Sequence, residues 1–321
     1  MPSNSSYRFL FVSDFHCRWA QLNGLRHWLA TTPTATLDAV WVGGDLLNVN
    51  HPRHLQPLAH LTRDPTLEPP TDDPADVVAY QRVIAAFASL NLPVLVVPGN
   101  HDPWYAFDPR SPLWTCQPTE LTGDLPTGPQ VVSVHGHVLA LRPHLWIAGL
   151  GGSVDVVGYQ PPHPRIWDGF PYDEGSMERD LSLVVDKLVG TKSPNHTVVW
   201  LTHNGPSNCV TCETNSDPDG RPESREEYGS SALRQVLENM SRLHPVALNI
   251  HGHSHHAWGL GRSGRVPVVN PGALRDGRFV IVTLSKVAGS GDSDQWMMTD
   301  CEFHRLPEPD DSSANDEPVV S

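Results

Sequence analysis

The sequence is poor in positive charge. Its 321 residues include 22 lysines and arginines against 36 aspartates and glutamates, so the formal net charge is -14. A surface that tracks nucleic-acid phosphates or anionic lipid needs an excess of Lys and Arg. The composition therefore disfavours nucleic acid and membranes as partners, whereas a small anionic substrate can still bind if metal ions supply positive charge.

Cysteine and long apolar runs are also scarce. Five cysteines, an odd number on so long a chain, do not resemble the dense, evenly numbered framework of a small secreted domain. The first six residues are polar, and no later run approaches the roughly 18 apolar residues of a membrane span. We therefore expect a cytoplasmic protein whose residues 1–6 are disordered.

The apolar content of 39% is enough for a substantial core. We expect one domain over residues 7–306. From residue 307 the chain reads PEPDDSSANDEPVVS, an acidic segment that is too polar to fold alone. We expect this tail, residues 307–321, to be disordered.

Five short apolar runs each end in polar residues, which is typical of buried strands. They are Tyr7–Val12, Ala39–Val42, Val94–Val97, Thr197–Leu201 and Val246–Ile250. Expected helices alternate with them at Trp19–Ala30, Ala75–Leu90, Asp173–Val189 and Ser230–Met240. This alternation predicts an open α/β sheet, in which ligands bind at the carboxyl ends of the strands.

A second, partly antiparallel sheet is predicted from further strand-like runs with little helix between them. These are Leu145–Leu150, Val266–Asn270, Phe279–Leu284 and Trp296–Phe303. Three stretches look irregular and are rich in Pro, Asp, Thr or Gly: His51–Asp73, Pro103–Pro129 and Asn204–Glu227. Loops of this length in a compact domain are often functional.

The polar residues that follow the five runs are metal-ligand types. The first two runs lead to Asp14-x-His16 and to Asp45, which follows a glycine pair where the backbone can turn sharply. The third leads to Gly-Asn100-His101-Asp102. The last two lead to His203 and to Gly-His253-Ser-His255, and histidine is the commonest metal ligand.

These five elements, in this order, resemble the signature of the calcineurin-like metallophosphoesterases: D-x-H, G-D, G-N-H-D/E, H and G-H-x-H. The resemblance extends from Asp14 to His255. It implies a four-layer α/β/β/α sandwich of two mixed β-sheets flanked by helices. It also implies that one metal is held by Asp14, His16, Asp45 and His255, and the other by Asp45, Asn100, His203 and His253.

Two divalent ions about 3.5 to 4 Å apart can bind the phosphate oxygens and lower the pKa of a bridging water, and the hydroxide then attacks phosphorus in line. Oxygen and nitrogen ligands without thiolate suit Mn, Fe or Zn. His101 resembles the family histidine that contacts the phosphate and protonates the leaving oxygen, with Asp102 orienting its imidazole.

Asn48 separates the chain from two branches of the family. Ser/Thr protein phosphatases continue the Gly-Asp element with Arg-Gly, whereas this chain reads Asp45-Leu-Leu-Asn48. Purple acid phosphatases have a tyrosine ligand where Asn48 stands. The C-terminal part, from Asn249 through His253-Ser-His255 to the Asn270-Pro-Gly turn, resembles the small Icc-like phosphoesterases.

That branch favours phosphodiesters as substrates. A phosphomonoesterase of the same superfamily, or a metal-binding scaffold without turnover, is the alternative. A nuclease fits poorly, since it needs a basic surface.

Several residues have a plain interpretation beside a functional one. Cys209-x-x-Cys212 has the spacing of half a zinc site, but without a second cysteine pair we expect unpaired thiols in a loop. Trp104 and Tyr105 could stack on a base or cover the core. His135 and His137 flank a glycine in an expected hairpin turn, as surface histidines.

Overall fold

The computed structural model describes residues 5–32, 37–51, 61, 71–108, 131–160, 163–167, 169–191, 196–215, 225–287 and 295–308. Most of the two segments that we expected to be disordered, 1–6 and 307–321, falls outside these ranges. The same holds for most of 51–73 and for residues 109–129 of the second stretch that we expected to be irregular.

The first of two six-stranded sheets has the strand order β16-β15-β1-β2-β3-β4. β1 to β4 run parallel, and β15 and β16 join them as antiparallel strands at one edge. The bounds are β1 (Ser6–Val12), β2 (Ala39–Val42), β3 (Val94–Val96), β4 (Val131–Ser133), β15 (Arg278–Val287) and β16 (Gln295–Arg305).

The second six-stranded sheet has the order β13-β14-β12-β9-β6-β5. Its four central strands are parallel, and β13 and β5 are antiparallel edges. The bounds are β5 (Val138–Arg142), β6 (Leu145–Leu150), β9 (Thr197–Thr202), β12 (Val246–Ile250), β13 (Gly259–Ser263) and β14 (Val266–Asn270).

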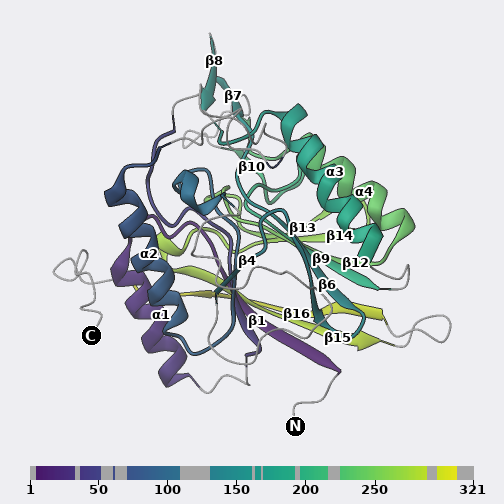
Figure 1. Cartoon of the computed structure of the whole chain (residues 1–321), viewed down its shortest axis with the longest axis horizontal. Helices are drawn as coiled ribbons and strands as arrows, with labels where there is room; N and C mark the ends of the chain where they lie inside the picture. Colours follow the sequence, from purple (N-terminus) through teal and green to yellow (C-terminus); the bar gives the residue numbers. More distant parts are fainter. Residues whose placement is uncertain are drawn as a thin grey trace.

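The two sheets lie face to face with helices on their outer faces (Figure 1). α1 (Trp19–Thr31) and α2 (Pro74–Ala88) cover the first sheet, and α3 (Glu174–Thr191) and α4 (Ser231–Leu243) cover the second. In β2, Val40 points to the helix side and Trp41 into the layer between the sheets, where it stacks on Phe9 at 3.6 Å. The predicted four-layer α/β/β/α sandwich is confirmed.

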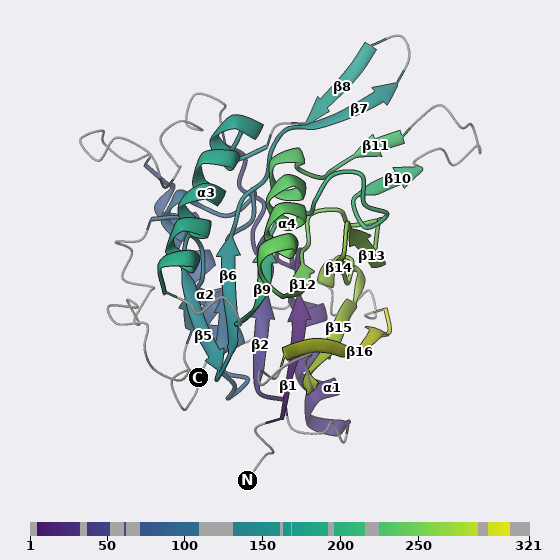
Figure 2. The same cartoon turned by 90° about the vertical axis from the view of Figure 1, so that its right-hand side faces the viewer.

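A small antiparallel sheet, β10-β11-β7-β8, extends beyond the carboxyl ends of the main strands (Figure 2). It comprises β7 (Val156–Gln160), β8 (His163–Trp167), β10 (Glu213–Asn215) and β11 (Arg225–Glu227). The last two lie within the stretch 204–227 that we expected to be irregular. Three-residue strands are too short to show a period in the sequence.

The structure corrects how the strands are shared between the sheets. β1, β2 and β3 belong to the first sheet, whereas β9 and β12 belong to the second, so the five ligand-bearing strands do not form one open sheet. β15 and β16 join the first sheet instead of the second. Strands buried on both faces read as continuous apolar runs, and such runs do not reveal which strands pair.

The expected hairpin at residues 135–137 is wrong as well. β4 lies in the first sheet and β5 in the second, so the chain crosses between sheets at Gly136, whose φ is +69°. His135 is buried, and its Nδ1 accepts a hydrogen bond from the Gly151 N–H at 2.9 Å. Among the described helices, none is long and apolar enough to cross a membrane.

Candidate metal centre

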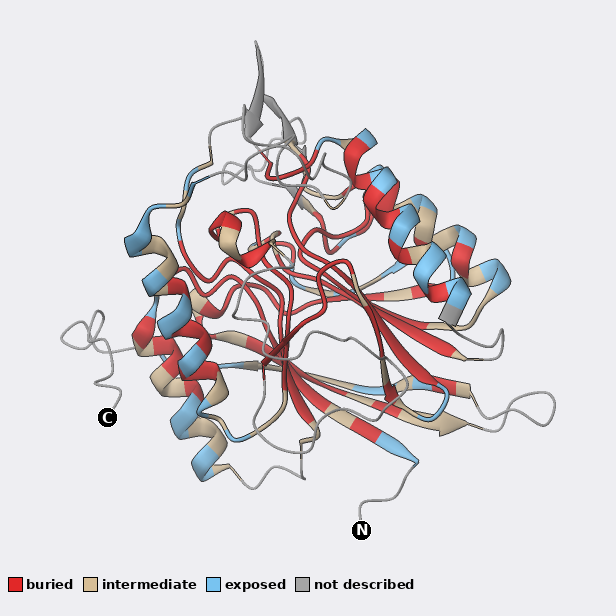
Figure 3. Ribbon diagram, viewed as in Figure 1, coloured by how far each residue is buried: buried red, intermediate tan, exposed pale blue. Residues whose placement is uncertain are grey.

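Five loops meet where the carboxyl ends of the two sheets come together. Each follows one of β1, β2, β3, β9 and β12, and together they carry all seven predicted metal ligands: Asp14, His16, Asp45, Asn100, His203, His253 and His255. These loops are almost entirely buried (Figure 3). Parallel strands of the two sheets thus deliver their C-terminal residues to one place.

Several of these residues adopt a backbone conformation that side chains with a Cβ rarely take. φ is 58° at Asp14, 49° at His16, 53° at Asp45 and 64° at His253. Each such residue costs about 1–3 kcal/mol and persists only where its surroundings enforce it. Here the loops enforce it, since Asp14 N–H donates to Gly44 O at 2.9 Å and His16 N–H donates to Asp45 O at 3.0 Å.

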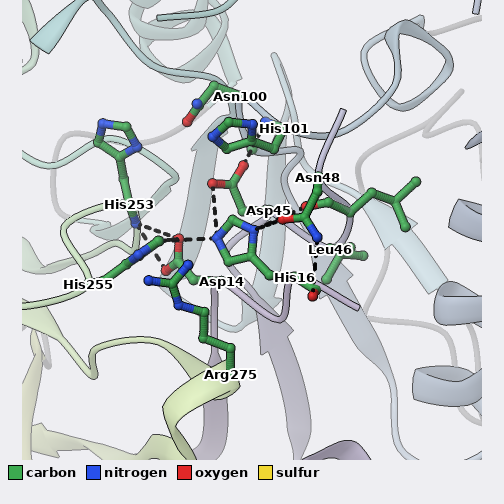
Figure 4. A network of polar contacts seen from close by, with 12 residues as sticks. Asp14, His16, Asp45, Leu46, Asn48, Asn100, His101, His253, His255 and Arg275 are labelled. Carbon is green, nitrogen blue, oxygen red and sulfur yellow. Dashed lines mark hydrogen bonds and ion pairs between the residues drawn. The ribbon is translucent and has the colours of Figure 1, made fainter. Parts of the chain in front are cut away.

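One cluster consists of Asp14, His16, Asp45 and His255. Each offers a ligand atom, and these atoms all lie within 4.8 Å of one another. His16 Nε2 lies 3.7 Å from Asp45 Oδ2 and 3.2 Å from His255 Nε2, and His255 Nε2 lies 3.1 Å from Asp14 Oδ1 (Figure 4). This spacing is what four ligands around one cation require.

A second cluster consists of Asp45, His203 and His253, again with ligand atoms within 4.8 Å of one another. His203 Nε2 lies 3.5 Å from Asp45 Oδ2 and 3.0 Å from Asn100 Oδ1, so the amide joins this group. Asp45 is common to both clusters. A carboxylate has two oxygens and can therefore serve two cations.

Contacts behind the ligands orient two of the rings. His16 Nδ1 lies 2.7 Å from Asn48 Oδ1, and His203 Nδ1 lies 2.6 Å from Gly43 O. A ring that donates from Nδ1 presents Nε2 as its lone pair. Both Nε2 atoms point into the clusters, which is the usual arrangement of metal-ligating histidines and the acceptors behind them.

The electrostatics of the two carboxylates call for a cation. Burial raises the pKa of Asp14, but His255 and His203 outweigh it and bring the pKa to about 2. Burial raises the pKa of Asp45 too, yet His203 holds it well below its usual range. Conversely, burial lowers the pKa of His203, but Asp45 and Asp14 raise it to about 9. Without a metal, a proton on His203 supplies the charge.

Two observations show that the residues fit metal ions. His253 Nε2 is buried with no hydrogen-bond partner, and burial lowers the pKa of this ring to about 3, so the ring is neutral with a free lone pair. The Nε2 atoms of His16 and His255 also lie only 3.2 Å apart, close enough for one cation to bind both.

A family model described as calcineurin-like phosphoesterase matches residues 7–257. The chain belongs to this family. Its members are metal-dependent phosphoesterases, that is, hydrolases. No curated protein matches the chain.

A solved structure shares the fold. It matches 94% of this chain and 100% of its own, with a TM-score of 0.58 and 18% identity. Two further solved structures match with lower scores. The protein TT1561 of Thermus thermophilus matches 87% of this chain and 94% of its own, with a TM-score of 0.49 and 17% identity. A dimetal phosphatase from Danio rerio matches 92% of this chain and 99% of its own, with a TM-score of 0.47 and 13% identity.

The predicted contact between Asp102 and the His101 ring is wrong. The Asp102 carboxylate is buried and accepts hydrogen bonds from the N–H groups of Leu46, Leu47 and Gly99, at 2.7, 3.1 and 2.8 Å. The His101 ring instead contacts Val49 O through Nδ1 at 3.0 Å. Asp102 therefore links the Asp45 loop to the Asn100 loop, because its short carboxylate accepts hydrogen bonds from backbone N–H groups of both loops.

Other residues singled out in the sequence lie in the core. Trp104 is buried, and Tyr105 packs against the same apolar cluster. Cys209 and Cys212 are free thiols, as expected, yet both are buried. Their loop contacts His251, which lies two residues before the proposed ligand His253, since Thr211 Oγ1 lies 2.9 Å from His251 Nε2.

Asn48 contacts a proposed ligand, which the sequence did not reveal. Its amide contacts the His16 ring and, through Nδ2, the His16 carbonyl at 3.4 Å. Asn48→Ala is expected to weaken metal binding by about 10- to 100-fold, because the His16 ring loses its orientation. Isothermal titration with Mn²⁺ measures this. Asn239→Ala on the exposed face of α4 is the matched control and keeps wild-type affinity; equal affinities in all three proteins would contradict the role.

Proposed function

We propose that this chain hydrolyses phosphate esters with two divalent metal ions. Asp14, His16, Asp45 and His255 hold one ion, and Asp45, Asn100, His203 and His253 hold the other. The observation that carries the proposal is the membership of Asp45 in both ligand clusters. When bound, such ions polarise the phosphate and acidify water at neutral pH. Nitrogen and oxygen ligands without thiolate favour Mn, Fe or Zn.

His101 is the residue that we propose to meet the ester itself. Its ring lies beside the cluster, with the His16 ring centroid at 5.7 Å. Since Nδ1 is engaged by Val49 O, Nε2 is the nitrogen left for the substrate. In its charged form this ring can protonate the leaving oxygen, which is the role of a general acid.

We propose phosphodiesters as the preferred class. A diester carries a second substituent that must fit beside the scissile phosphate, and a cavity of about 560 Å³ adjoins the cluster at His255. The net charge of -14 supports a small ester over nucleic acid.

The test is a comparison of four substrates with defined Mn²⁺, Fe²⁺ or Zn²⁺: an aryl phosphomonoester, an aryl phosphodiester, cyclic AMP and a short single-stranded DNA. We expect turnover of diesters above that of the monoester. Turnover of the monoester alone would sink the diester preference, and no turnover of any substrate would favour a binding scaffold.

Metal binding is expected to release protons. The carboxylates raise the pKa of His203 to about 9, so at pH 7 the metal-free ring is charged and must lose its proton to become a ligand. Affinity for Mn²⁺ should therefore fall as pH falls from 8 to 6, by about tenfold per unit for each proton displaced. Titration calorimetry in buffers of different ionisation enthalpy counts the protons; a pH-independent affinity would contradict the expectation.

A further inference from the structure

A cavity of about 560 Å³ lies beside the metal centre and is lined by four arginines. His255 forms part of its wall, so the cavity and the metal site share a ligand. The arginines are Arg18, Arg275, Arg278 and Arg305. On a chain with a net charge of -14, this local gathering of positive charge next to the reacting centre needs an explanation.

The arginines come from distant parts of the chain. Arg18 precedes α1, Arg275 lies in the short helix Leu274–Asp276, Arg278 begins β15, and Arg305 ends β16. The backbone couples one of them to the metal site, because Arg275 N–H donates to Asp14 O at 3.1 Å. Figure 4 shows the Arg275 guanidinium extending on the side of the site where Asp14 and His255 lie.

Among the residues that the structure describes, nearby carboxylates do not neutralise this charge. Asp276 and Glu308 also line the cavity, two acids against four arginines. Arg305 contacts Glu308 at 3.3 Å, and Arg275 contacts Asp276 at only 3.9 Å. Both are exposed or half-buried pairs of little energetic worth. Arg18 has no ion pair within the part of the chain that the structure describes.

Arg278 is held in place. Its guanidinium lies 4.2 Å from the ring centroid of Trp258, a cation–π contact that fixes the plane while leaving the edge N–H groups available. Burial, and next the charge of Arg305, lower the pKa of Arg278. An anion between these two guanidiniums would relieve their repulsion. Arginine presents paired N–H donors that match phosphate oxygens.

We propose that this cavity binds a second phosphate group of the substrate, so that the preferred substrates are phosphodiesters that carry a further phosphate. The inference rests on the proposed function, because the metal centre must hold the scissile phosphate. Its physical basis is separate, since four guanidiniums attract a dianion whether or not metals are present.

The first experiment measures binding without turnover. Full-length protein is freed of metal with a chelator and titrated with thymidine 3′,5′-bisphosphate in a calorimeter. Arg275→Met/Arg278→Met should bind at least about tenfold more weakly than the wild type, since two charge-assisted contacts are lost. Arg242→Met, at the far end of α4, removes one exposed charge elsewhere and should bind as the wild type does. Equal affinity in all three proteins would overturn the proposal.

The second experiment uses a matched substrate pair with Mn²⁺. Thymidine 5′-(p-nitrophenyl phosphate) and its 3′-phosphorylated form have the same scissile ester and leaving group and differ by one phosphate. We expect kcat/KM to be at least about tenfold higher for the phosphorylated form, and the double arginine variant to reduce this ratio. A ratio near one, or a ratio that the variant does not change, would overturn the cavity's role while leaving the esterase function intact.

The single variant Arg18→Met tests the cavity's role in case the double variant misfolds. This exposed side chain has no described ion pair to lose, so the fold should be unaffected, and the ratio should fall in the same direction. Absence of turnover with both thymidine esters would count against the proposed function, whereas the binding experiment would still decide the cavity's role.

Discussion

Asp45→Asn is expected to lower kcat/KM on an aryl phosphodiester by about a thousandfold or more. Asp45 is the residue common to the two clusters, with Oδ2 at 3.7 Å from His16 Nε2 and 3.5 Å from His203 Nε2. Asparagine keeps the shape but not the charge, and its nitrogen cannot ligate a cation. Both proposed metal positions are weakened at once, so kcat/KM should fall close to that of the enzyme without metal.

Steady-state kinetics with saturating Mn²⁺ measure this loss, and circular dichroism checks the fold. Glu238→Gln is the control, because it removes one carboxylate from an i,i+4 pair with Arg234 on α4, where an exposed pair contributes less than about 1 kcal/mol. The control should retain full activity. A variant at position 45 that keeps a tenth of wild-type turnover would exclude the bridging role.

Gly252→Ala is expected to destabilise the fold and disrupt the metal centre together. A Cβ at Gly252 would lie 1.8 Å from Ser13 Oγ and 2.6 Å from Asp14 Oδ2, far inside contact distance. The two loops come from different sheets, so the clash forces β1 and β12 apart at their ends. Overpacking of this kind costs about 1–3 kcal/mol, and the displacement of Asp14 should also weaken metal binding.

Urea unfolding of metal-free protein measures the stability change, and Mn²⁺ titration measures the affinity. Gly190→Ala in α3 is the matched substitution, and it is expected to change the free energy of unfolding in the opposite direction. A Cβ there meets no atom within 4 Å, so alanine should stabilise the helix by up to about 1 kcal/mol. Equal stability of both variants would show that the contact at Gly252 yields easily.

Many individual helices and strands were predictable because each element carries its own pattern, whereas the four layers were expected from the family resemblance. The helix expected at Trp19–Ala30 is observed as Trp19–Thr31, and the strand at Ala39–Val42 has the predicted bounds. The partition of strands between sheets was not predictable. β1 and β9 are apolar on both faces over most of their length, and only the packing of Phe9 and Trp41 in the layer between the sheets shows where the layers divide.

The sequence by itself predicted the proposed ligands, because aspartate, asparagine and histidine follow the strands in the order of the family signature that the chain resembles. The sequence did not predict which residues contact these ligands or support their loops. Asn48 looked like a branch marker and proved to contact His16, while Asp102 proved to join backbone loops.

The arginine-lined cavity was visible only in the tertiary structure. Arg18 and Arg305 lie at opposite ends of the sequence, and no local pattern relates them. They meet because β16 pairs with β15 and β15 with β1, which brings the end of the last strand to the start of α1. The type of a ligand is set by a single residue, whereas a charged cavity needs several residues to lie close together. Only the folded chain brings residues that are distant in sequence to that proximity.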